Sequence, residues 1–147
     1  VDRTHHKEYL RLIKHYEKGS YREVIQGFEL LDNSNIVVAN PTRRRALSDV
    51  FYYWRAKSFL ELSEYHNALR ETYRFRSANN QITGSYVLDQ YWTKQYYLKG
   101  LAYEGLGDER NARESYKDFL KVWSEADDDL PEIIDAKKRL KDLGWAS

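Results

Sequence analysis

Three short segments of the chain could supply aromatic rings, hydroxyls and cations at one interval. Each is a tyrosine, an apolar residue and a cation, and successive copies stand 44 residues apart. Aromatic rings bury a large area at a small cost in entropy, hydroxyls bond to a peptide backbone, and cations pair with carboxylates. This chemistry is noncovalent recognition. The segments are Tyr9-Leu10-Arg11, Tyr53-Trp54-Arg55 and Tyr97-Leu98-Lys99.

Residue types that carry catalysis or bind metals are sparse in this chain. It contains no cysteine, which excludes disulfides, thiolate catalysis and zinc-thiolate sites. It has no Walker-type phosphate loop and no His-Glu-x-x-His signature, and none of its four histidines pairs with another at i and i+4. The acidic run 127–129 lacks the alternating ligands of a calcium loop, and helix capping explains it more simply. We therefore expect no enzyme, no catalytic residue, no metal and no cofactor.

The 44-residue interval predicts an internal repeat. Ten residues after each tyrosine stands a turn former or small residue, and five residues further stands an apolar residue. Self-similarity at such a period marks stacked units of secondary structure that cannot bury their apolar faces alone. The two further columns are Gly19, Ser63 and Gly107, and Val24, Ala68 and Ala112.

The length and the net charge of the chain limit the number of domains and the kinds of partner that we expect. The 147 residues suffice for one domain with a core. A net charge of +1, with both signs mixed along the chain, gives no bias toward nucleic acid or acidic membranes, and the basic run 43–45 is interpreted as a solvated helical turn. No apolar stretch of 18 residues is present, so we expect no membrane segment. The given residues have no signal-like start, so we expect them to carry no secretory address. Because they start at Val1 without Met, we expect them to be a piece of a larger protein. Its compartment stays open, with the cytoplasm favoured over the periplasm.

Apolar residues at helical spacing predict helices joined in pairs, and hence an all-α fold. Gly19 suits the end of a helix because glycine adopts positive φ without steric cost. Polar residues that can cap a helix, and prolines suited to a first turn, stand where several of these helices should begin. The predicted caps are Ser20, Asn40, Asp89 and Asp129, and the prolines are Pro41 and Pro131.

The last predicted helix has the character of a terminal cap. It offers Ile133, Ala136, Leu140 and Leu143 to the preceding helices. Its cations are expected to point outward, and they are Lys137, Lys138, Arg139 and Lys141. The last unit of a repeat array needs such a helix to cover its open face. A single domain over residues 1–147 follows, with repeat 1 at about 5–32, repeat 2 at about 41–78, repeat 3 at about 90–124 and the capping helix at about 130–143.

The third unit resembles the tetratricopeptide repeat family, in which helix-turn-helix hairpins carry small residues where the helices cross. The resemblance implies an α-solenoid of three hairpins with a C-terminal capping helix. The family repeat has roughly 34 residues, so the longer interval here must lengthen helices or loops. The residues that carry the resemblance are Gly100, Tyr103, Leu106, Gly107, Ala112 and Tyr116, followed by Ala56, Phe59, Leu62, Tyr65 and Ala68 in the second unit.

The stretch 97–143 is also similar to the closing repeat of C-terminal repeat regions in some bacterial signalling proteins, including Ser/Thr kinases and nucleotide cyclases. The similarity implies a bacterial origin and a C-terminal position in the parent protein. It rests on Leu106-Gly107-Asp108, Ala112, Tyr116, Phe119-Leu120, Trp123, Ala126-Asp127 and Leu130-Pro131-Glu132.

In tetratricopeptide repeats the first helix of each hairpin lines a concave groove that holds a partner peptide or helix. The resemblance places the tyrosine column in that groove, where its rings would anchor a ligand. In the alternative, the tyrosines pack on one another or on the capping helix. The expected groove residues are His6, Tyr9, Ile13 and Tyr16, then Val50, Tyr53, Lys57 and Leu60, then Lys94, Tyr97, Leu101 and Glu104.

The other two columns of the repeated segment have roles of their own. The middle residues, Leu10, Trp54 and Leu98, are expected to pack. The cations are expected to pair internally, although partner carboxylates are an alternative. The expected pairing is of Arg11, Arg55 and Lys99 with Glu8, Glu61 or Glu104.

The sequence favours an interaction scaffold that binds a partner peptide or helix, or mediates self-association. Some relatives of the family clamp a terminal carboxylate with lysine and asparagine. Tyr9 and Ile13 replace those residues here, so that mode is not expected. The rival function is a ligand-sensing regulatory module attached to a bacterial signalling enzyme, in which Lys57 and Lys94 hold a small ligand or anion. An RNA-binding repeat would need a continuous basic face, which the sequence does not supply.

Overall fold

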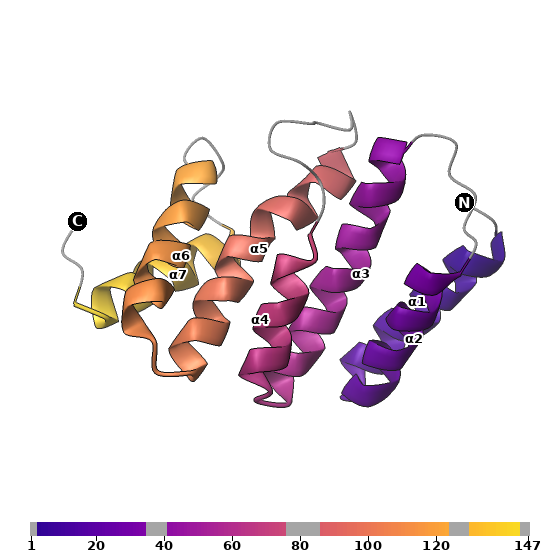
Figure 1. The fold of residues 1–147 in the computed structure, drawn as a ribbon, viewed down its shortest axis with the longest axis horizontal. Helices are drawn as coiled ribbons and strands as arrows, with labels where there is room; N and C mark the ends of the chain where they lie inside the picture. The colour runs from indigo at the N-terminus through magenta and orange to yellow at the C-terminus, as the bar shows by residue number, and fades with distance from the viewer. Residues whose placement is uncertain (1–2, 35–40, 76–85, 124–129, 145–147) are drawn as a thin grey trace.

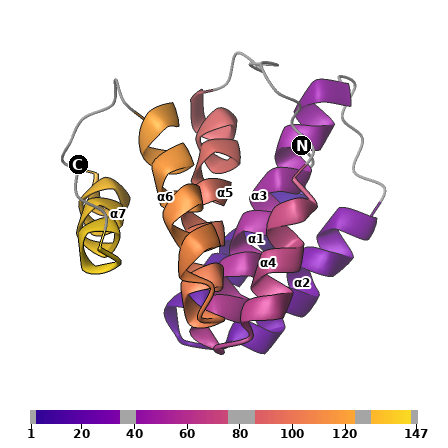
Figure 2. The same cartoon turned by 60° about the vertical axis from the view of Figure 1, so that its left-hand side comes forward.

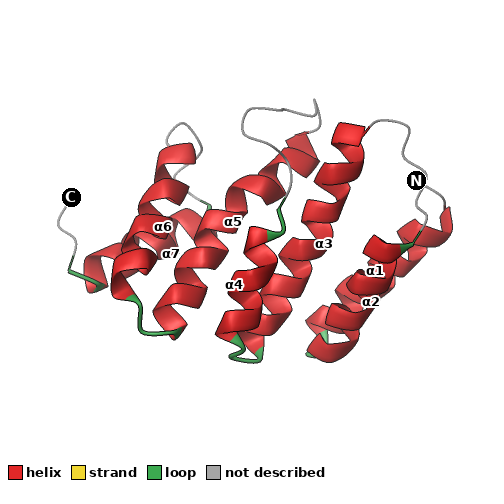
Figure 3. Ribbon diagram, in the orientation of Figure 1, coloured by secondary structure: helices red, strands yellow, loops and turns green. Residues whose placement is uncertain are grey.

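The computed structural model describes residues 3–34, 41–75, 86–123 and 130–144, and these residues contain seven helices and no strand (Figures 1 and 3). The all-α prediction is confirmed for this part of the chain. The helices are α1 (Arg3–Glu17), α2 (Tyr21–Asn33), α3 (Pro41–Glu61), α4 (Tyr65–Tyr73), α5 (Tyr86–Gly105), α6 (Glu109–Val122) and α7 (Pro131–Asp142).

The helices follow one another in chain order from one end of the molecule to the other, with the two termini at opposite ends (Figure 1). Contacts join α1 to α2, α3 to α4 and α5 to α6, and further contacts join α2 to α3, α3 to α5 and α4 to α5. Helix α7 packs on α6, and Figure 2 shows it at the edge of the array. Each helix therefore buries its apolar side mainly against near neighbours in the sequence.

The core consists of several apolar clusters along this row. At the N-terminal end, Leu12, Val24 and Phe28 are fully buried between α1, α2 and α3. At the C-terminal end, Tyr116 and Phe119 of α6 pack with the apolar face of α7. The predicted packing face of α7 is confirmed, because Ile133, Ala136 and Leu140 are all buried there.

Three turns share one hydrogen-bond pattern, and they lie at the predicted column of turn residues. After α1, the Gly19 amide donates to the Tyr16 carbonyl at 3.0 Å and the Ser20 amide donates to the His15 carbonyl at 2.9 Å. This is the Schellman ending of a helix, which needs a residue with positive φ. The same two bonds recur after α3 and α5, and φ is +78° at Gly19, 56° at Ser63 and +76° at Gly107.

Five residues after each of these turn residues, the chain has entered the first turn of the next helix. The amides of Val24, Ala68 and Ala112 each donate to the carbonyl of the residue that precedes the helix, at 2.9 to 3.2 Å. All three side chains are fully buried. A small or compact side chain at this point lets the second helix approach the first, because a larger side chain would hold the helices apart.

Several predicted helix starts are wrong in detail. Ser20 stands at the N-cap of α2, but its side chain makes no capping hydrogen bond. Helix α5 begins at Tyr86, so Asp89 lies within the helix. The N-cap of α7 is Leu130, with Pro131 in the first turn as predicted. The predicted caps Asn40 and Asp129 lie outside the described residues.

Ser63 holds a positive φ without being glycine, which predicts a stabilising substitution. A side chain in the left-handed region costs roughly 1 kcal/mol, and glycine removes that cost. Ser63→Gly is therefore expected to raise the free energy of unfolding by about 0.5 to 1 kcal/mol in urea denaturation. Ser63→Ala is the control and should bring no gain. A loss of stability in Ser63→Gly would contradict this account of the turn.

Candidate functional site

The central tyrosine of the repeated column is part of the packing between helices. Tyr53 is 6% exposed and lies in a buried cluster with Ala56 and Leu98. Its ring meets the ring of Tyr91 on α5 edge-on, with centroids 4.9 Å apart. Burial raises the pKa of the Tyr53 phenol above its usual value. This ring therefore joins α3 to α5.

The two outer tyrosines of the column are half-buried. The Tyr9 ring meets the ring of Phe28 edge-on, with centroids 5.8 Å apart. The Tyr97 ring lies 5.4 Å from the ring of Phe119, and its hydroxyl donates to Asp135 Oδ2 of α7 at 2.6 Å. Burial and this hydrogen bond raise the Tyr97 pKa. All three tyrosines thus make contacts within the chain.

Lys57 on α3 lies among three aromatic rings, one from α1 and two from α3, which we call the aromatic cage. Its ammonium nitrogen lies 5.0 Å from the ring centroid of Tyr16, 5.5 Å from that of Tyr53 and 5.1 Å from that of Trp54. The ring faces attract the cation. Burial and the nearby charge of Lys94 lower the pKa of Lys57, while the carboxylate of Glu132 acts in the opposite direction. The cage therefore holds an ammonium that is partly removed from water.

Helix α7 is attached to α5 by a ladder of polar contacts. Lys94 Nζ lies 3.1 Å from Glu132 Oε1, and Arg139 Nη1 lies 3.0 Å from Glu104 Oε1. The Tyr116 hydroxyl of α6 donates to the second oxygen of Glu104 at 2.6 Å. Two predicted groove residues of α5 therefore hold the final helix. The prediction that Arg139 points outward is wrong, because its guanidinium reaches back to α5.

A cleft of about 380 Å³ opens beyond this ladder, at the C-terminal ends of α3 and α5. Tyr65, at the start of α4, forms one wall and lies close to Gly105, where a Cβ atom would come within 2.3 Å of the ring. The lining combines aliphatic side chains with two carboxylates and one guanidinium. The lining residues are Leu60, Glu61, Tyr65, Leu101, Glu104, Gly105 and Arg139.

The predicted groove set therefore divides between packing and the cleft. Leu60, Leu101 and Glu104 line the cleft. Val50 is buried, and Ile13 packs against the N-terminal core cluster. The remaining members lie as follows: His6 is exposed, Tyr9, Tyr53 and Tyr97 pack between helices, Tyr16 and Lys57 form the aromatic cage, and Lys94 pairs with α7.

The middle column of the repeated segment does not behave uniformly. Leu98 is buried and Trp54 packs against two core clusters, as predicted. Leu10 is 46% exposed, so its predicted packing role is wrong. It lies on α1, the first helix of the array, which has no preceding helix among the described residues to cover that side.

The three cations of the repeated segment each contact residues of the same chain. Only one of them contacts the partner that was predicted from the sequence. Arg11 pairs with Glu8 at 2.6 Å, as predicted. Arg55 does not pair with Glu61; it pairs across helices with Glu29 and Glu71. The predicted partner Glu104 is also wrong for Lys99, whose ammonium bonds to Gln95 at 3.3 Å and lies 4.6 Å from the ring centroid of Tyr73.

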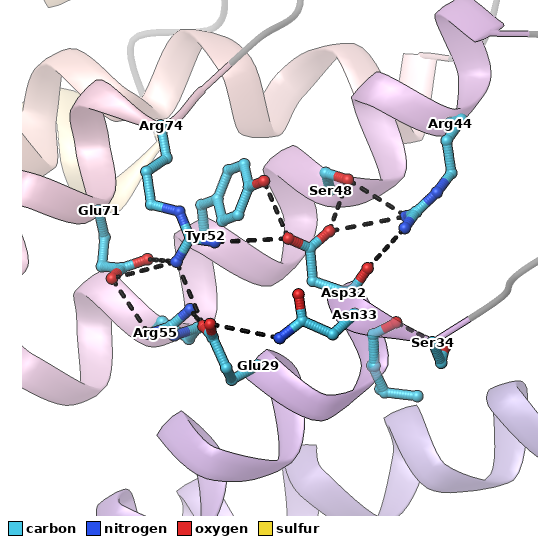
Figure 4. Close-up of polar contacts among 11 residues, drawn as sticks. Glu29, Asp32, Asn33, Ser34, Arg44, Ser48, Tyr52, Arg55, Glu71 and Arg74 are labelled. Atoms are coloured by element: carbon cyan, nitrogen blue, oxygen red, sulfur yellow. Dashed lines mark hydrogen bonds and ion pairs between the residues drawn. The ribbon is translucent and has the colours of Figure 1, made fainter.

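Arg55 belongs to a polar network between α2, α3 and α4 that the sequence did not indicate (Figure 4). Glu71 is 1% exposed and lies 3.2 Å from Arg55 and 3.1 Å from Arg74. Arg74 continues to Asp32 at 3.5 Å, and its guanidinium lies 4.4 Å from the ring centroid of Tyr52. Glu71 and Arg74 are three residues apart, but the pairs that join different helices link residues far apart in the sequence, so local spacing gives no signal for them.

Asp32, near the C-terminal end of α2, is the other centre of the network. It accepts hydrogen bonds from the hydroxyls of Ser48 at 2.7 Å and Tyr52 at 3.0 Å. Arg44 donates to the Asp32 carbonyl oxygen at 2.7 Å and lies 3.7 Å from its carboxylate. The basic residues balance the carboxylates, so this cluster acts as a polar clamp between helices.

Within the part of the chain that the structure describes, no three histidine, aspartate or glutamate side chains gather into a metal site. No described helix is long and apolar enough to cross a membrane. Comparison of the chain with protein-family models, curated proteins and solved structures finds no match. A functional proposal must therefore rest on the cleft and its surroundings.

Proposed function

We propose that the chain is a tetratricopeptide-like solenoid that serves as a protein-interaction scaffold. In this proposal the helix pairs α1–α2, α3–α4 and α5–α6 are three repeats, and α7 is the capping helix. The proposal is supported by the three equivalent turns, whose hydrogen bonds and positive φ recur at the 44-residue interval. It is supported further by the buried column at Val24, Ala68 and Ala112.

The observation that carries the binding function is the mixed lining of the cleft. Leu60, Leu101 and the ring of Tyr65 offer an apolar floor. Glu61 is exposed and accepts a hydrogen bond from the Tyr16 hydroxyl at 3.1 Å, and it forms no ion pair with the other described residues. Polar atoms contribute more of the cleft surface than apolar atoms, so its charged groups would fix the orientation of a ligand and its leucines would add apolar contact. The cleft suits a partner segment with an apolar side chain next to a lysine or arginine.

A library of displayed peptides, selected against the full chain, tests this function. We expect the selection to enrich peptides that carry an apolar residue beside a basic one. Leu101→Gln should weaken binding of an enriched peptide by about tenfold, because it makes the cleft floor polar. The matched control is Leu30→Gln, because Leu30 is 73% exposed on α2 and does not line the cleft.

The outcomes of the selection are distinct. If no peptide family is enriched, or if enriched peptides bind the Leu101→Gln variant with unchanged affinity, the proposed binding function of the cleft is wrong. Circular dichroism of both variants must give the same helical content as the parent chain. A fall in affinity that Leu30→Gln shares equally would point to a general effect of the substitution and would also count against the cleft.

A small ligand is the second candidate occupant. The cleft volume of about 380 Å³ lies at the lower end of the range for small-molecule pockets. A ligand that binds the folded state raises the apparent stability by mass action, so a thermal-shift screen of metabolites separates this candidate from the first. A metabolite whose stabilising effect disappears in Leu101→Gln would favour the sensor function.

A further inference from the structure

Two pairs of charged residues lie along α3 and α5, and we call the surface that carries Lys57, Glu61, Lys94 and Glu104 the inner face of the array. On α3 the cation Lys57 precedes the carboxylate Glu61, and on α5 the cation Lys94 precedes the carboxylate Glu104. Both helices therefore place positive charge nearer the N-terminal side and negative charge at the C-terminal end. A helix that docks across this face meets attraction in one direction and repulsion in the other.

Helix α7 already follows this order on α5. Its first turn brings Glu132 to Lys94 at 3.1 Å, and its last turn brings Arg139 to Glu104 at 3.0 Å. Glu132 precedes Arg139 in α7, and their partners Lys94 and Glu104 follow the same order in α5. Helix α7 therefore runs in the same direction as α5. Acid first and base last is thus the charge order that fits this face.

Among the described residues, the corresponding charges on α3 form no ion pair with another helix, although α5 packs against α3. Lys57 forms no ion pair within 4.0 Å among the described residues, although three aromatic rings surround its ammonium. Glu61 accepts a hydrogen bond from the Tyr16 hydroxyl of α1 and likewise forms no ion pair in the described part of the chain. Burial lowers the pKa of Lys57 even though the carboxylates of Glu132 and Glu61 act in the opposite direction, so a closer carboxylate would offset more of the cost of burying this ammonium.

The cleft lies between this unpaired set and the ladder that holds α7. Its floor residues Leu60 and Leu101 come from α3 and α5, and Arg139 of α7 forms part of its wall. An amphipathic helix could therefore place its apolar side on the floor and its charged residues over Lys57 and Glu61.

We propose that this inner face binds one amphipathic helix of a partner protein, running parallel to α3, with an acidic residue toward Lys57 and a basic residue toward Glu61. The inference rests on the proposed function and names its partner: a helix with acid early and base late, the charge order of α7. A small carboxylate would satisfy Lys57 but not Glu61, so the pair of charges favours a helix.

Two peptides of equal composition test the charge order. The first has the sequence of residues 130–143, and in the second the residues corresponding to Glu132 and Arg139 are exchanged. Within the chain, α7 competes at its own position at a high effective concentration, so the added peptide reports on the α3 side. We expect the full chain to bind the first peptide about tenfold more tightly in a fluorescence anisotropy titration, because the exchange turns two attractions into repulsions.

Variants of the chain test whether the preference between the two peptides depends on Lys57 and Glu61. The double variant Lys57→Glu/Glu61→Lys should prefer the exchanged peptide, and Lys57→Gln/Glu61→Gln should bind both peptides equally. Circular dichroism and the melting temperature of each variant establish that it is folded. A preference that persists unchanged in both variants would mean that the peptide displaces α7, and it would overturn the proposal.

The remaining outcomes separate this inference from the proposed function. If the native chain binds both peptides equally, the charge order is wrong while the cleft remains a binding site. If neither peptide binds but library peptides do, the helical partner is wrong and the scaffold function stands. If neither peptide nor any library member binds, both proposals fail.

Discussion

Replacing Glu71 with glutamine is expected to lower the free energy of unfolding by about 3 kcal/mol. Glu71 is 1% exposed and pairs with Arg55 at 3.2 Å and Arg74 at 3.1 Å. The amide keeps the shape of the side chain but removes its charge, so the buried guanidinium of Arg55 keeps only its contact with Glu29. Urea denaturation at neutral pH measures the loss.

The matched control removes the charge of an exposed ion pair. Glu114 pairs with Lys117 at 3.2 Å on the surface of α6. Exposed pairs of this kind contribute between about 0 and 1 kcal/mol, so Glu114→Gln should change stability little. Equal losses in Glu71→Gln and Glu114→Gln would show that the polar network does not stabilise the packing of α2, α3 and α4 in the manner inferred.

Gly100→Ala is expected to lower the free energy of unfolding by about 2 kcal/mol, although alanine favours helices by about 1 kcal/mol over glycine. A Cβ atom on Gly100 would lie 2.3 Å from Cε1 of Tyr116. The Tyr116 ring is fully buried and its hydroxyl is held by Glu104 at 2.6 Å, so it has little freedom to move away. Thermal and urea unfolding measure the effect.

The sign of this effect should depend on the ring of Tyr116. In a Tyr116→Val background the clash is absent, and Gly100→Ala should then stabilise the chain through helix propensity alone. Tyr116→Val by itself lowers the free energy of unfolding because it leaves a cavity. This loss is present in both the single variant Tyr116→Val and the double variant, so it cancels when the two are compared. If Gly100→Ala stabilises the native chain, the contact between α5 and α6 is looser than the structure indicates.

The turns were predictable because their cause is local. Gly19 and Gly107 have positive φ at the ends of helices, and Ser63 takes the same conformation at the equivalent position. A Schellman turn involves only neighbouring residues, so its sequence pattern survives in the fold. The predicted capping role of Ser20 is wrong, whereas Asp108 in the equivalent turn accepts a hydrogen bond from the Asn111 amide at 3.1 Å.

The candidate site was predictable only in part. The resemblance to tetratricopeptide repeats placed Leu60, Leu101 and Glu104 in one predicted groove, and in the structure these three residues line one cleft. The predicted groove set did not distinguish the tyrosines that pack between helices from the residues that line the cleft. Whether a side chain faces a neighbouring helix or a cleft depends on how tightly successive helices approach, and the periodicity of one helix contains no information about that distance.

By itself, the sequence determined the helical class, the turn columns and the apolar face of α7, because helix propensity, positive φ and apolar spacing act within a few residues. Only the tertiary structure decided the partners of Arg55, the cage around Lys57 and the attachment of α7 through Glu132 and Arg139. These contacts join residues that are distant in the chain. Their geometry follows from the packing of whole helices, which fixes which charges are buried together and which remain without a partner.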